Sequence, residues 1–79
     1  MEIKVLGPGC AKCKRLEDAV KAAVRELELK ASVTKVEDMM EIMNYGVTMT
    51  PALVVDGKVV LKGRIAGVKE VKDLLTKQF

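Results

Sequence analysis

The sequence predicts an α/β domain in which elements in the order β-α-β-α-β-β-α build a four-stranded mixed sheet with helices on both faces. Three observations lead to this fold class. Residues 2–6 alternate polar and apolar side chains and precede an apolar stripe at helical spacing, which indicates a strand leading into a helix. The dipeptide Asp56-Gly57 separates two apolar runs, as in a β-hairpin. A length of 79 residues suits one domain, so residues 1–79 are expected to form a single unit.

The first strand is expected over residues 2–6 and the first helix over about residues 11–28. The apolar stripe of this helix consists of Cys13, Leu16, Ala19, Val20, Ala23, Val24 and Leu27. Residues 7–9, Gly-Pro-Gly, join the two elements, and their glycines let the backbone turn tightly into the helix.

A β-branched run over residues 31–36 predicts the second strand. Because a helix connects it to the first strand, the usual right-handed crossover makes the two strands parallel. Asp38 followed by Glu41 is typical of a capping box and predicts a short helix over residues 39–44. Tyr45-Gly46 should end that helix, with the glycine in a left-handed conformation.

Four methionines, Met39, Met40, Met43 and Met49, lie on or just after the short helix. Methionine clusters can bind copper(I). The chain has only two aromatic residues, however, and the first three methionines recur at helical spacing, so we expect these side chains to fill gaps in the core.

The remaining sequence predicts a hairpin and a last helix. Proline cannot donate to a strand ladder, so Pro51 should open the third strand. Residues 53–55 are continuously apolar, as in a central strand that is covered on both faces. The last helix should bury a stripe made of Val68, Val71, Leu74 and Leu75, and no good N-cap residue precedes it.

Composition limits the partners and the compartment. The net charge is +3, but the lysines are spread along the chain without interleaved aromatic residues, so nucleic-acid binding is not predicted. The apolar stretches are too short to cross a bilayer, and a strand pattern follows Met1 without a signal-peptide region. We therefore expect a cytoplasmic monomer with neither a nucleic-acid nor a membrane partner.

Cys10 and Cys13 are the only cysteines, and they lie at the junction of the first strand and the first helix. Unbonded amides and the positive end of the helix dipole favour a thiolate at Cys10. Lys12 adds a nearby cation, or is an ordinary exposed lysine. Closing so short a loop stabilises a fold by only about 2 kcal/mol, so in a reducing compartment the pair indicates redox or metal chemistry.

Several motifs together resemble the thioredoxin fold. They are residues 7–13 (Gly-Pro-Gly-Cys-x-x-Cys), residues 45–47 (Tyr-Gly-Val), residues 50–57 (Thr-Pro-Ala-Leu-Val-Val-Asp-Gly) and Gly63-Arg64. More closely, the sequence is similar to the small archaeal and bacterial thioredoxin/glutaredoxin-like proteins, also called redox-active disulfide proteins, over nearly the whole chain. A Cys-x-x-Cys pair alone is also found in zinc sites, but its combination with Thr50-Pro51 is far more specific.

The resemblance implies a thiol–disulfide oxidoreductase with protein-disulfide reductase activity. Cys10 would be the exposed attacking thiol and Cys13 the buried resolving thiol. Pro51 would be cis and pack against the disulfide, the backbone of Thr50 would pair with an incoming substrate strand, and Gly9 would also contact the substrate. The implied partners are a disulfide-containing protein substrate and a thiol reductase or other reductant, and neither a cofactor nor a bound metal is expected.

Two departures from familiar members concern the active segment. Thioredoxins carry Trp before the first cysteine and Gly-Pro between the two, and glutaredoxins carry Pro-Tyr between them. Here Gly9 precedes the pair and Ala11-Lys12 separates it, so the redox potential, the reductase and the use of glutathione remain open.

Two other functions use the same cysteines. A carrier of soft metals such as copper, zinc or mercury would bind them as thiolates. However, Pro8 stands where such domains usually have Met, and two thiols without a histidine cannot complete a tetrahedral zinc site. A redox-sensing module would need the same accessible cysteine of low pKa, so the sequence does not separate sensing from catalysis.

Overall fold

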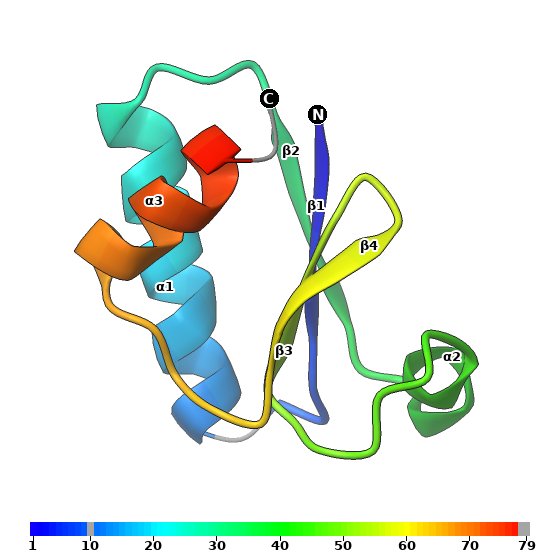
Figure 1. Cartoon of the computed structure of the whole chain (residues 1–79). Coiled ribbons are helices and arrows are strands. Elements are labelled where there is room, and N and C mark those ends of the chain that lie inside the picture. The colour runs from blue at the N-terminus through cyan, green and yellow to red at the C-terminus, as the bar shows by residue number, and fades with distance from the viewer. Residues whose placement is uncertain (10, 78–79) are drawn as a thin grey trace.

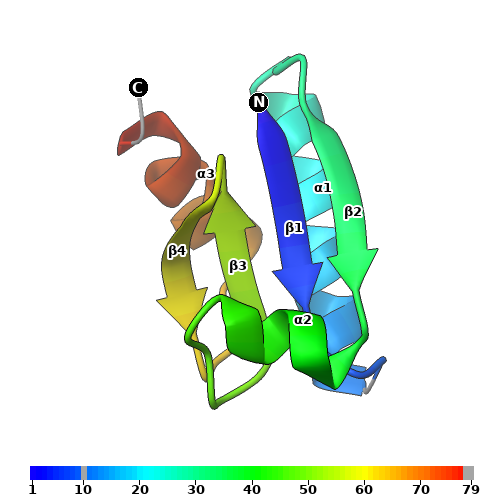
Figure 2. The same cartoon turned by 90° about the vertical axis from the view of Figure 1, so that its right-hand side faces the viewer.

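The computed structural model describes residues 1–9 and 11–77 of the chain. In these residues four strands form one sheet in the order β2-β1-β3-β4, with α1 and α3 on one face and α2 on the other (Figures 1 and 2). The elements are β1 Glu2–Leu6, α1 Ala11–Glu26, β2 Ser32–Val36, α2 Met39–Asn44, β3 Ala52–Val55, β4 Lys58–Lys62 and α3 Val68–Lys77. The predicted mixed sheet with helices on both faces is confirmed.

The strand pairing determines which ends of the strands meet. β1 pairs in parallel with β2, from Glu2 opposite Ser32 to Leu6 opposite Val36. β3 pairs antiparallel with both β1 and β4, and all four of its residues are buried, as expected for a central strand. The carboxyl ends of the parallel strands β1 and β2 therefore lie at the same edge of the sheet, where a site commonly forms in α/β folds.

Each face of the sheet has its own apolar cluster. On the first face, α1 and α3 pack against β1, β3 and β4 through eleven buried residues, among them Leu16 and Val20 of α1 and Leu75 of α3, and Ala66 of the loop before α3 completes the cluster. On the second face, Ile42 of α2 joins a smaller cluster with Leu6, Val36, Val47, Ala52 and Val54.

Most element boundaries agree with the sequence prediction, and the differences are small. Helix α1 ends at Glu26, and the chain turns soon after, since Glu28 adopts a left-handed conformation with φ 54°. Pro51 precedes the first residue of β3 and does not belong to the strand. Asp56 and Gly57 have φ of 49° and 83°, which confirms the predicted turn between β3 and β4.

The expectation that the methionines fill the core is wrong. Their exposed fractions are 53% for Met39, 71% for Met40, 61% for Met43 and 62% for Met49. Helix α2 has only six residues, and Ile42 is the one that it buries. A helix this short presents a single inward position to the sheet, and a branched side chain already occupies it.

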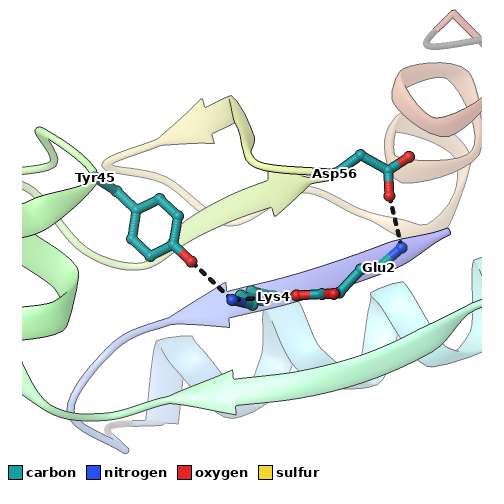
Figure 3. A network of polar contacts seen from close by, with 4 residues as sticks. All are labelled: Glu2, Lys4, Tyr45 and Asp56. Carbon is teal, nitrogen blue, oxygen red and sulfur yellow. Dashed lines mark hydrogen bonds and ion pairs between the residues drawn. The ribbon is translucent and has the colours of Figure 1, made fainter.

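A polar network ties the carboxyl end of α2 to the sheet (Figure 3). The Nζ of Lys4 on β1 donates a hydrogen bond of 2.9 Å to the Oη of Tyr45 and lies 3.1 Å from a carboxylate oxygen of Glu2. The backbone N–H of Glu2 donates to Asp56 Oδ1 over 2.8 Å. The hydrogen bond to Tyr45, followed by that to Glu2, raises the pKa of Lys4 above its ordinary value.

A side-chain hydrogen bond caps the start of helix α2. Asp38 is its N-cap residue, and a carboxylate oxygen of Asp38 accepts a hydrogen bond of 2.8 Å from the backbone N–H of Met40. The predicted start of this helix is therefore confirmed. Gly46 follows the helix with φ 76°, the left-handed conformation expected of it.

Candidate active site

The cysteine motif lies at the start of α1. The helix begins at Ala11, the residue after Cys10 in the sequence, and Cys13 lies in its first turn with 1% of its surface exposed. Lys12, between the two cysteines, is exposed. Cys10 itself lies outside the described residues, so its accessibility and its thiolate character remain predictions.

Gly7 packs its bare backbone against the buried sulfur. A Cβ atom added at Gly7 would lie 2.1 Å from Cys13 Sγ and 3.1 Å from Cys13 Cβ, so no side chain fits there without displacing the cysteine. The backbone N–H of Gly7 donates a hydrogen bond of 2.9 Å to the carbonyl of Val36 at the end of β2. The sequence marked Gly7 as a turn residue, and its contact with the sulfur was not foreseen.

The segment before β3 reaches the same place from the other side. The peptide bond between Thr50 and Pro51 is cis, Pro51 is buried and Thr50 is half-buried. The Cβ of Thr50 lies 4.0 Å from the position of the added Gly7 Cβ. The carbonyl of Pro51 accepts a hydrogen bond of 2.9 Å from the N–H of Gly63, which anchors the segment to the end of β4.

Three of the motif residues therefore converge. Gly7, Cys13 and Thr50 come from the end of β1, the first turn of α1 and the segment before β3, and Gly7 lies between the buried sulfur of Cys13 and the side chain of Thr50. The thiol is therefore held beside the backbone of the loop that follows β1, which is a suitable setting for thiol–disulfide exchange with a polypeptide.

Glu37 is a site neighbour that the sequence analysis missed. Gly9 is exposed and has φ 90°, and a Cβ added to it would lie 3.2 Å from Glu37 Oε2. The Nζ of Lys35 is 3.9 Å from Glu37 Oε1 and 3.8 Å from Glu17 Oε1 on α1. Glu37 directly follows β2, so its position at the carboxyl edge of two parallel strands was the signal that could have identified it.

The metal-carrier alternative depends on both cysteines. Among residues 1–9 and 11–77, no three His, Cys, Asp or Glu side chains gather as potential ligands of a metal ion. Cys10, half of the thiolate pair that a carrier would use, is not among these residues. No helix in the same described part is long and apolar enough to span a membrane.

Comparison with known proteins places the chain among redox proteins. The family model of the thioredoxin domain matches residues 1–76. A thioredoxin of Methanothermobacter thermautotrophicus is 40% identical over 76 residues, which cover 96% of this chain and 99% of that protein. A thioredoxin of Methanocaldococcus jannaschii is 40% identical over 73 residues, covering 92% of this chain and 84% of that protein.

Proposed function

This chain belongs to the thioredoxin domain family, and we propose that it is a thiol–disulfide oxidoreductase that works through Cys10 and Cys13. Membership of the family supports a redox activity of this general kind. The specific proposal is the reduction of disulfides in protein substrates, with both electrons carried by the two thiols. A separate thiol reductant then returns the pair to the dithiol form.

The observation that carries the proposal is the surrounding of Cys13. Its sulfur is buried at the start of α1 and packed against the backbone of Gly7, which also lies close to Thr50. A buried thiol three residues after a second cysteine in the sequence suits a resolving role, because water and foreign thiols have little access to it. Thr50, which is half-buried close to Gly7, precedes the buried Pro51, and in this proposal its backbone pairs with an extended substrate segment.

The proposed reaction has two exchange steps. The Cys10 thiolate attacks one sulfur of the substrate disulfide, so that a bond forms between Cys10 and the substrate while the substrate S–S bond breaks. The released substrate thiolate takes up a proton. Cys13, as thiolate, then attacks the Cys10 sulfur, which releases the second substrate thiolate and leaves a Cys10–Cys13 disulfide. Two electrons pass from the protein to the substrate, and the external reductant restores them.

The neighbouring residues have supporting roles in this proposal. Lys12, which is exposed, places a cation between the cysteines and favours the thiolate form of Cys10. Gly9 has the positive φ that glycine tolerates best, and in this proposal its exposed backbone contacts the substrate. Because the sequence contains no histidine, proton transfer falls to lysine, to carboxylates or to water.

The test is insulin reduction with dithiothreitol as the reductant. The wild type is compared with Cys10→Ser and Cys13→Ser. We expect Cys10→Ser to be inactive because the attacking sulfur is gone. Cys13→Ser should accumulate a mixed disulfide with the substrate, since nothing resolves the first exchange; mass spectrometry under non-reducing conditions detects that species.

The same preparations distinguish the metal-carrier alternative. Absence of turnover by the wild type, together with tight retention of copper or zinc by the reduced protein, would contradict the redox proposal and favour metal transport. If Cys13→Ser turned over insulin at the wild-type rate and no mixed disulfide accumulated, the two-cysteine mechanism would be contradicted. A mechanism that uses Cys10 alone would then explain the activity.

A further inference from the structure

The exposed methionines of α2 form one face of the helix. At about 100° per residue, Met39, Met43 and Met40 fall within an arc of about 100°. The buried Ile42 lies beside this arc and holds the helix against the sheet. Three large apolar side chains therefore point away from the core. A single exposed apolar side chain needs no explanation on a small domain, but a cluster of three does.

Acidic residues flank the methionines in the sequence, and the nearest lysine before them, Lys35, is already paired with Glu37 and Glu17. Glu37, Asp38 and Glu41 are exposed next to them in the sequence. Every one of the 14 Lys and Arg residues lies outside the stretch from residue 36 to residue 57, although the chain as a whole is basic. We call the surface made by these residues the α2 face; it consists of Glu37, Asp38, Met39, Met40, Glu41 and Met43.

The α2 face adjoins the candidate active site. Figure 2 shows α2 crossing the end of the sheet where β1 and β2 finish and β3 begins. Glu37 links the two regions directly, because its carboxylate lies against Gly9, the residue before Cys10. A polypeptide seated on α2 would therefore reach the cysteines without crossing the rest of the molecule.

We propose that the α2 face docks a basic, apolar segment that flanks the disulfide of the protein substrate. Methionine is flexible and polarizable, so it adapts to apolar side chains of different shapes. The surrounding carboxylates attract lysine and arginine and speed the encounter. This inference rests on the proposed oxidoreductase function and adds the chemistry by which that function selects its substrates.

Other occupants fit this surface less well. In a dimer formed through α2, the symmetric contact would bring Asp38 and Glu41 close to the same acids of the second copy, without any cation between residues 36 and 57 to offset them. The negative surface of an anionic membrane would be repelled for the same reason. A hollow of about 330 Å³ lined by Glu41, Asn44 and Tyr45 lies beside α2; it has one carboxylate, and the hydroxyl of Tyr45 already accepts from Lys4.

The experiment compares matched disulfide-bridged peptides as substrates. One carries Lys and Leu on both sides of its disulfide, the second carries Glu and Leu, and the third carries Lys and Ser. The second-order rate of their reduction by pre-reduced protein is measured by chromatography, with the small neutral hydroxyethyl disulfide as a reference that has no flanking segment. At low ionic strength we expect the Lys/Leu peptide to react about tenfold faster than the Glu/Leu peptide. Added salt should reduce this preference.

Two sets of variants separate the two parts of the surface. Met39→Gln, Met40→Gln and Met43→Gln together should abolish the preference for Lys/Leu over Lys/Ser, whereas Leu at the same three positions should retain it. Asp38→Asn with Glu41→Gln should abolish the preference for Lys over Glu, and asparagine can still cap the helix. Asp18→Asn with Asp73→Asn is the matched control, since it removes two acids from α1 and α3 on the opposite face.

The outcomes distinguish the inference from the function on which it rests. Equal rates for all peptides in the wild type, or a preference that survives both sets of variants, would overturn the docking proposal if hydroxyethyl disulfide is still reduced. Failure of the wild type to reduce hydroxyethyl disulfide would instead contradict the oxidoreductase function. A wild-type dimer that the three Gln substitutions dissociate, seen by sedimentation, would assign the surface to a second copy and also overturn the proposal.

Discussion

The two faces of the sheet are built differently. The face under α1 and α3 is closed by twelve buried residues, eleven from two helices and three strands and one, Ala66, from the loop before α3. The opposite face has six buried residues and is covered by a single short helix, which buries Ile42 and exposes three methionines. Polar contacts such as the Lys4–Tyr45 hydrogen bond supplement this thinner cover.

We infer that the two faces have different roles, with the α1 and α3 face supplying stability and the α2 face binding the substrate. The large cluster removes enough apolar surface from water to hold a small domain together. The lightly covered face carries the helix whose surface we assign to substrate docking, and it adjoins the loop that leads to Cys10. The segment before β3 and Gly7 lie at the junction of the two faces, where Cys13 is held.

The largest effect should come from a substitution in the large cluster. Leu16→Ala removes a fully buried side chain of α1 and should lower the free energy of unfolding by about 3 kcal/mol. Met40→Ala, on the exposed side of α2, should change it by less than about 0.5 kcal/mol. Urea unfolding followed by circular dichroism measures both. If the two variants lost equal free energy of unfolding, the two faces would not differ in their contribution to stability, contrary to this prediction.

The junction of the faces should be nearly as sensitive. Gly7→Ala places a Cβ where Cys13 Sγ lies, and the overpacking should cost about 1–3 kcal/mol. We also expect slower insulin reduction, because the resolving sulfur is displaced. Gly46→Ala is a useful control, since a Cβ there meets nothing within 4 Å and only the positive φ is strained. Insulin reduction by this control should remain close to that of the wild type.

The two sides of the molecule should respond to opposite extremes of pH. The pKa of Lys4 is raised above 10.5 by Tyr45 and Glu2, so its stabilisation is complete below that pH and is lost as the pH rises through the raised value. The pKa of Glu70 on α3 is lowered below 4.5 by its hydrogen bond with Arg64, so its stabilisation is present above that pH and is lost on acidification.

Urea midpoints of single variants test these windows. Lys4→Met should be less stable than the wild type at neutral pH and approach it in alkali, well above pH 10.5. Arg64→Gln should be less stable at neutral pH and approach the wild type in acid, well below pH 4.5. If the difference in urea midpoint between either variant and the wild type stayed constant across the pH range, the pair that this variant removes would not respond to pH as stated.

The smallest effect concerns the start of α3. The carbonyl of Gly67 accepts a hydrogen bond of 3.0 Å from the N–H of Val71, so Gly67 occupies the N-cap position. Gly67→Ser should raise the free energy of unfolding by about a few tenths of a kcal/mol, because the hydroxyl can accept a hydrogen bond from a free N–H of the first turn. Thermal unfolding of the two proteins detects the change, and a lower midpoint for Gly67→Ser would contradict it.

The fold could be predicted from the sequence because its signals are local. The turn at Asp56-Gly57, the cap at Asp38 and the apolar stripe of α1 each depend on neighbouring residues, and each is present in the structure. The methionines were misplaced because three similar side chains on a six-residue helix do not reveal which one faces the sheet. In the structure Ile42 occupies that position, and the methionines are left outside.

The candidate site was predictable only in part. The motifs identified Cys13 and Thr50, and the structure places both close to Gly7. The contact between Gly7 and the sulfur is a close approach of two segments, and the approach of Glu37 to Gly9 depends on how β2 ends. Neither follows from sequence spacing, because both require the registered pairing of β1 and β2.

The strand order also determines where a strand of another molecule could add to this sheet. β2 and β4 are its outer strands, and each exposes unpaired backbone groups to which a neighbouring chain could add. Lys35 of β2 and Lys58 and Lys62 of β4 are exposed on these two edges. An added strand would have to desolvate these ammonium groups, so the lysines protect the protein from edge-to-edge aggregation at the high concentrations of a cell.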